Sequence, residues 1–126
     1  MPALEPITGF RVVASPEGLD GARWTGEAVS IIRIAPDEAL GLGASAVAVD
    51  DPDAIIEAET GFVGASLDGN QRRALAAHVD WKLPMEPGAL GQGKIAGVPA
   101  RLLVGTPSLL VTQAAYANEL RSRLGW

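Results

Sequence analysis

His78 is the residue on which most acid–base or nucleophilic chemistry in this chain would depend. It is the only histidine among 126 residues, and cysteine is absent. A Ser-His-Asp triad or a histidine-bound metal would have to include His78, and a cysteine nucleophile or thiolate zinc site is excluded. The sequence places His78 in the last turn of an expected helix, where a cation interacts favourably with the negative end of the dipole. We expect a structural role for His78 and assign no catalytic residue.

The other short polar and glycine motifs lack parts that a metal or nucleotide site needs. Asp50–Asp53 offers oxygen ligands, but it lacks the glycine and the distant glutamate of a calcium loop, so we expect a capped turn. Glu57 and Glu59 would share one face of a strand as solvated side chains or as an acid pair. Gly41–Gly43 and Gly91–Gly93 are too short for a phosphate loop or a dinucleotide fingerprint. The sequence therefore predicts no metal site and identifies no cofactor-binding residue.

Four residues are candidates for an interface with another protein. Trp81 and Trp126 lie in an expected loop and at the chain end, where tryptophan either closes the edge of a core or anchors a contact. Arg72 and Arg73 lie on an expected helix, as a solvated face or as a small basic contact. Ten basic and fifteen acidic residues give a net charge of −5, which argues against nucleic acid as a partner.

Length and composition predict a globular protein. Residues 27–126 are expected to form one domain after an N-terminal lead or edge segment at 1–26, with a core of Ala, Val, Leu and Ile, since only 5% of residues are aromatic. No window approaches the ~20 apolar residues of a membrane span, and the acid- and proline-bearing N-terminus is unlike a signal peptide. We expect a cytoplasmic protein that does not contact membranes.

The first half of the chain gives mixed local signals. Residues 28–34 predict a strand covered on both faces, ended by Pro36, after which 36–38 suggests a helical turn. Residues 40–49 return to extended character. The segment 54–57 is compatible with a short helix capped at Asp51 or with a short strand, because its periodicity is too brief to decide.

The second half is more regular. Phe62–Leu67 alternates as a strand with Val63, Ala65 and Leu67 on one side, and Asp68 with Gln71 forms a capping box for a helix ending near Asp80. The elements expected beyond it are a loop at 82–93, strands at 94–96 and 99–104 around Gly97-Val98, a turn at 105–108 and a strand at 109–111. A final helix capped by Thr112 should follow and end at Gly125. Its Ala117, Leu120 and Leu124 lie on one stripe, and Glu119 can pair with Arg123. This predicts an α+β fold, a mostly antiparallel sheet with two main helices.

The order of these elements resembles the gamma subunit of heterotetrameric sarcosine oxidase. The residues that carry the resemblance are Leu67-Asp68-Gly69, Arg73-Ala74-Leu75, His78-Val79-Asp80, Leu90-Gly91-Gln92-Gly93, Ile95 to Leu102, Leu109-Leu110-Val111 and Tyr116 to Leu120. That family is related to the aminomethyltransferase folate-binding domain and to the first domain of the tRNA-modification GTPase. The resemblance, which spans about 29–124, implies that type of fold.

Two functions follow from the resemblance. As in the gamma subunit, the chain would be non-catalytic by itself and act by association, either in an amine-oxidising or one-carbon enzyme or as a homo-oligomer. Alternatively, the fold would bind a folate or pteridine-type ligand, with a homodimer as one arrangement that the resemblance allows. The cysteine-bearing signature of related folate-binding repair proteins is absent, so folate is implied by family analogy only and no contact residue is transferred.

Overall fold

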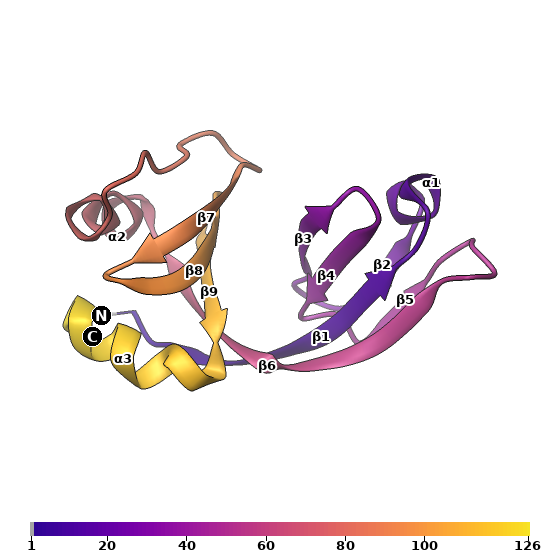
Figure 1. Cartoon of the computed structure of the whole chain (residues 1–126), viewed down its shortest axis with the longest axis horizontal. Helices are drawn as coiled ribbons and strands as arrows, with labels where there is room; N and C mark the ends of the chain where they lie inside the picture. The colour runs from indigo at the N-terminus through magenta and orange to yellow at the C-terminus, as the bar shows by residue number, and fades with distance from the viewer. Residues whose placement is uncertain (1) are drawn as a thin grey trace. The chain divides into compact units, whose positions relative to one another are not determined.

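The computed structural model describes residues 2–126 and has an α+β architecture in which antiparallel strands predominate (Figure 1). This confirms the predicted fold class. In chain order the elements are β1 (Glu5–Val13), α1 (Pro16–Asp20), β2 (Arg23–Thr25), β3 (Ser30–Ala35), β4 (Glu38–Leu42), β5 (Ala46–Ala48), β6 (Ile55–Leu67), α2 (Gly69–Ala74), the 3-10 helix η1 (Leu75–His78), β7 (Leu90–Ile95), β8 (Val98–Leu103), β9 (Ser108–Gln113), the 3-10 helix η2 (Ala114–Tyr116) and α3 (Ala117–Leu124).

These elements form two compact units. The N-terminal unit is Ile7–Gly61, and the C-terminal unit combines Phe62–Trp126 with the residues up to Pro6. Among residues 2–126, no helix is long and apolar enough to cross a membrane.

The N-terminal unit is built from a β1-β4-β3 sheet and a β2-β5 pair. The segment expected as a lead or edge contains β1, α1 and β2, and β1 pairs with β4 from Gly9 to Val13. Val12 and Leu19 are buried in its core with Ala14 and Ala39. The residues around 54–57 belong to β6, so the strand alternative for this segment is confirmed.

Two expectations for this unit are wrong. β3 is not covered on both faces, because Ile32 is buried while Ile31 on the other face is 47% exposed. Residues 36–38 do not open a helix, because β3 turns back onto β4 and Ala35 pairs with Glu38. Proline suits the second position of a tight turn as well as the first turn of a helix, and strand pairing decides between the two.

Asp51 fastens the turn before β6. Its carboxylate accepts hydrogen bonds from the backbone N–H groups of Ser15 at 2.8 Å and Asp53 at 2.9 Å. These bonds, that of Ser15 first, hold the pKa of Asp51 below its ordinary value. The expected capped turn is confirmed.

The C-terminal unit has the strand order β6-β9-β8-β7, all antiparallel. One face of this sheet carries the core, which includes Val63, Leu67, Ile95, Leu102 and Leu110, each at most 6% exposed. Helix α3 adds Ala117 and Leu120 to that core, as predicted. Alternation along each strand leaves the side chains of the other face for the site described below.

Several local signals in this unit are confirmed. Asp68 and Gln71 form both bonds of the capping box, at 2.8 and 2.9 Å. Arg123 pairs with Glu119, and Gly125 ends α3 with a left-handed φ of 74°.

The α2–η1 segment ends at His78, two residues before Asp80, so the helix end expected near Asp80 is confirmed. Two other boundaries in this unit are wrong. β7 begins at Leu90, inside the loop expected at 82–93. Thr112 is not a helix cap, because β9 continues to Gln113. Its buried hydroxyl instead donates to the carbonyl of Pro99 at 2.8 Å, a contact that no local pattern encodes.

Candidate functional site

The open face of the C-terminal sheet is polar where β7, β8 and β9 lie side by side. Gln92 pairs with Arg101, and Arg101 pairs with Val111, so these three residues occupy one row across the strands. In the same sheet Phe62 of β6 pairs with Gln113 of β9. The register therefore brings amide, guanidinium and aromatic side chains together on one face.

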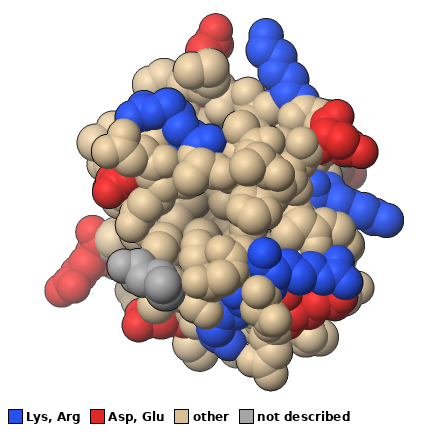
Figure 2. All heavy atoms as spheres, turned by 90° about the vertical axis from the view of Figure 1, so that its left-hand side faces the viewer, with Lys and Arg blue, Asp and Glu red and all other residues tan. Residues whose placement is uncertain are grey.

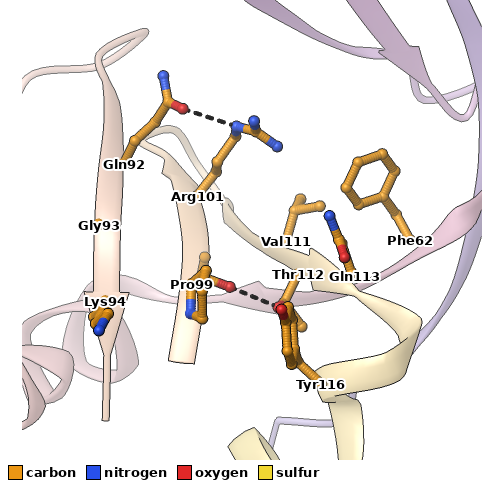
Figure 3. Close-up of a pocket in the computed structure, with 11 residues that line it drawn as sticks. Phe62, Gln92, Gly93, Lys94, Pro99, Arg101, Val111, Thr112, Gln113 and Tyr116 are labelled. Atoms are coloured by element: carbon orange, nitrogen blue, oxygen red, sulfur yellow. Dashed lines mark hydrogen bonds between the residues drawn. The ribbon is translucent and has the colours of Figure 1, made fainter. Parts of the chain in front are cut away.

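A hollow of about 310 Å³, called the sheet pocket, lies on this face. Figure 3 shows eleven residues that line it; those used below are Phe62, Gln92, Lys94, Arg101, Gln113 and Tyr116. Among the described residues, none that lines it is an aspartate or a glutamate. The pocket combines two cations with two aromatic rings and two amides, a combination suited to a small ligand that carries negative charge.

The strand ladder ends beside the pocket. The β8–β9 pairing begins at Arg101 and Val111, and Pro99 lies beyond it without an N–H to extend it. The Thr112 hydroxyl bridges this gap through its bond to the Pro99 carbonyl (Figure 3). The pocket is thus located where regular pairing stops and side chains supply the connection.

Arg101 is held in place within the pocket. Its Nε donates to Oε1 of Gln92 at 3.0 Å, and its guanidinium end is turned toward Phe62 across the pocket (Figure 3). Arg101 is half-buried. None of the salt bridges among residues 2–126 includes it, so no protein carboxylate neutralises this guanidinium there.

A second hollow, the Trp81 groove, lies between α2 and the loop that follows η1. It measures about 270 Å³ and is lined by Arg72, Arg73, Ala76, Val79, Trp81, Lys82, Leu83, Pro84 and Met85. Met85 is 65% exposed. A neighbouring hollow of about 400 Å³ shares Trp81 to Met85, so this loop segment is flanked by concave surface.

Trp81 is positioned by β7. Its Nε1 donates to the Lys94 carbonyl at 2.9 Å, and the indole lies against two glycines of the strand. A Cβ atom added at Gly93 would be 2.7 Å from the ring, and one added at Gly91 would be 3.2 Å from it. The glycines make room for the ring, which covers the core edge and lines the groove at once.

The structure brings together three of the four residues expected at an interface. Arg72, Arg73 and Trp81 all line the Trp81 groove. Trp126 does not; it is half-buried and packs against the core of the C-terminal unit. Figure 2 shows uncharged residues over much of the surface that it displays, with charged side chains lying among them and projecting at the edge.

His78 does not join a chemical cluster. Its side chain is exposed at the end of η1, and its carbonyl accepts a bond from the N–H of Ala96 at 2.7 Å. Among residues 2–126, no group of three or more His, Cys, Asp or Glu side chains is arranged to hold a metal.

Sequence reasoning pointed to Gly91–Ile95 and Trp81 as the lining of a possible ligand pocket, which includes Gln92, but it missed Arg101 and Met85 as site residues. Arg101 lies in the strand expected at 99–104, but the residues of its partner strand up to Gly93, Gln92 among them, were expected to form a loop. No model of a known protein family matches this chain, and no curated protein matches it.

Proposed function

We propose that this chain acts by association with a protein partner through the Trp81 groove. In this proposal it is a non-catalytic subunit of the kind suggested by its resemblance to the gamma subunit of heterotetrameric sarcosine oxidase. The observation that carries the proposal is the convergence of Arg72, Arg73 and Trp81 around one groove with exposed Met85 beside them. Tryptophan, arginine and methionine are enriched at protein interfaces.

The groove favours a partner segment that is apolar and acidic. Its apolar lining includes Leu83, Pro84 and Met85, while Arg72, Arg73 and Lys82 supply positive charge. The chain as a whole carries a net charge of −5, so this local basic rim differs from the average surface. Such a rim attracts and orients an acidic partner, and apolar burial supplies most of the affinity.

The experiment is purification of the tagged chain from its native host, with flavin absorbance and mass spectrometry of the eluate. Met85→Asp places a charge in the groove, and Ile55→Asp makes the matched change at a 55% exposed residue of the N-terminal unit. We expect a stoichiometric partner with the wild type and with Ile55→Asp, and its loss with Met85→Asp. The purified partner should then bind the wild type and Ile55→Asp with similar affinity and Met85→Asp much more weakly.

Two results would contradict association through this groove. One is a monomer that binds no protein at stoichiometric amounts. The other is a partner that Met85→Asp retains in full. A homo-oligomer that Met85→Asp dissociates would support the groove as an interface and would identify a second copy as the occupant in place of the acidic partner.

A small-ligand-binding module is the second candidate function. The sheet pocket favours it, because Phe62 and Tyr116 offer ring faces and Arg101 offers a fixed cation. By analogy with the resembled family, the first ligands to test are folates and other pteridines. We expect a concentration-dependent rise in melting temperature, and a flat response across these compounds would count against this candidate.

A further inference from the structure

We propose that the sheet pocket is a carboxylate site in which Arg101 binds the acid group of a small planar ligand. The ring of that ligand packs against Phe62. This inference rests on the second candidate function, ligand binding in the pocket, and names the chemical class of the ligand.

The geometry of Arg101 is the first support. The bond from Nε to Gln92 fixes the plane of the guanidinium and uses the one donor that lies along the side chain. The two terminal nitrogens form the remaining fork, and a carboxylate accepts two parallel bonds from such a fork. A pre-positioned arginine loses less side-chain entropy on binding than a free one.

The electrostatics of the pocket are the second support. Arg101 is half-buried, and the described lining residues contain no acid to neutralise it or Lys94. Partial burial of an uncompensated charge is unfavourable, so an anion gains from entering this site. The neutral amides of Gln92 and Gln113 add no opposing charge.

Size and shape restrict the ligand further. A volume of about 310 Å³ lies at the lower end of the roughly 300–1,000 Å³ typical of small-molecule sites. Phe62 and Tyr116 offer aromatic surface beside the guanidinium, and flat rings pack well against such surface. A single ring bearing a carboxylate satisfies both features.

The test compares benzoate with benzamide, a neutral molecule of nearly the same shape, by NMR titration of the labelled protein. We expect benzoate to shift the signals of Gly93, Gln113 and the Arg101 Nε–H in a saturable manner. Benzamide should bind at least about tenfold more weakly, because hydrogen bonds to charged groups are the stronger kind. Arg101→Met should abolish this preference, and Arg23→Met, at an exposed arginine of the N-terminal unit, should leave it unchanged.

Further variants and probes separate the possible outcomes. Arg101→Lys keeps the charge without the fork and should retain only part of the preference, and Gln92→Leu, which frees the guanidinium, should also reduce it. Equal affinity for benzoate and benzamide overturns the role of Arg101 even if folates raise the melting temperature. Inorganic phosphate that competes as strongly as benzoate overturns the carboxylate class in favour of a general anion site. No saturable shift with either probe, together with a flat folate response, overturns the second candidate function as well.

Discussion

Gly93→Ala tests how closely Trp81 is fitted to β7. The added methyl group would lie 2.7 Å from Cε2 and 2.8 Å from Nε1 of Trp81. Carbon atoms in contact are normally about 3.5–4.0 Å apart, so the indole must move by close to 1 Å. That movement pulls Nε1 away from the Lys94 carbonyl, to which it donates at 2.9 Å.

The expected change in the free energy of unfolding of Gly93→Ala combines three contributions. Forcing extra volume into a packed site costs about 1–3 kcal/mol. Loss of the indole hydrogen bond costs about 1 kcal/mol. Replacing glycine by alanine returns about 0.4–1 kcal/mol by restricting the unfolded chain. The net expectation is a fall of about 1–3.5 kcal/mol in the free energy of unfolding, because the steric term and the lost hydrogen bond together outweigh the entropic gain.

Urea denaturation followed by circular dichroism measures this change. Gly69→Ala is the control, because a Cβ atom there meets only the movable end of Arg73 at 3.2 Å, and we expect it to be neutral or slightly stabilising. The penalty of Gly93→Ala should largely vanish in a Trp81→Ala background, where nothing occupies the space. An equal penalty in both backgrounds would refute the packing argument.

Three other substitutions test two hydrogen bonds and one left-handed glycine. Thr112→Val should lower stability by about 1 kcal/mol in denaturant titration, since it removes a hydroxyl donor to the Pro99 carbonyl; an unchanged midpoint would show that this bridge contributes nothing. Asp51→Asn should lower the melting temperature at neutral pH by weakening the bond from Ser15. Because the folded-state pKa of Asp51 is depressed, the carboxylate stabilises the fold above its ordinary pKa, and this contribution is lost as pH falls through the lowered value. The melting temperatures of wild type and variant should therefore converge in acid. A difference in melting temperature that persists there contradicts the stabilising role of the Asp51 carboxylate. Gly125→Ala should cost about 1 kcal/mol, measured by thermal unfolding, because residue 125 has a left-handed φ of 74°; no loss would mean that the helix end relaxes freely.

The features that the sequence predicted correctly are those in which nearby residues complete an interaction by themselves. The capping box of Asp68 and Gln71, the Glu119–Arg123 pair and the stop at Gly125 are of this kind. Each interaction joins residues no more than four positions apart, or depends on the conformation of one glycine. Local spacing is sufficient for such features.

The features that it missed depend on residues distant in sequence. Glycine lowers strand propensity, so Gly91 and Gly93 indicated a loop; they lie in β7 because Trp81 covers them. Threonine is a residue type that often caps helices, but Thr112 lies within β9, where its hydroxyl bonds to the carbonyl of Pro99, 13 residues away in sequence.

The residues of the candidate sites also separate into those that local sequence identified and those that depend on distant residues. Trp81, Arg72 and Arg73 were selected by residue type, and the structure gathers them because α2 and the loop after η1 meet. Arg101 gained its role only from the register that pairs it with Gln92. Residue type alone therefore identified these three groove residues, whereas the role of Arg101 in the pocket required the strand pairing.

β7 makes the two candidate functions separable by mutation. Its alternation directs Gly91 and Gly93 toward Trp81 on one face, and Gln92 and Lys94 line the sheet pocket on the other. A change at Gly91, which contacts Trp81 and Pro84 and does not line the sheet pocket, should disturb the groove and spare benzoate binding, and Gln92→Leu should do the reverse. If both variants impair partner capture and ligand binding alike, the two surfaces act as one site, and the assignment of separate functions to the two faces of this strand is wrong.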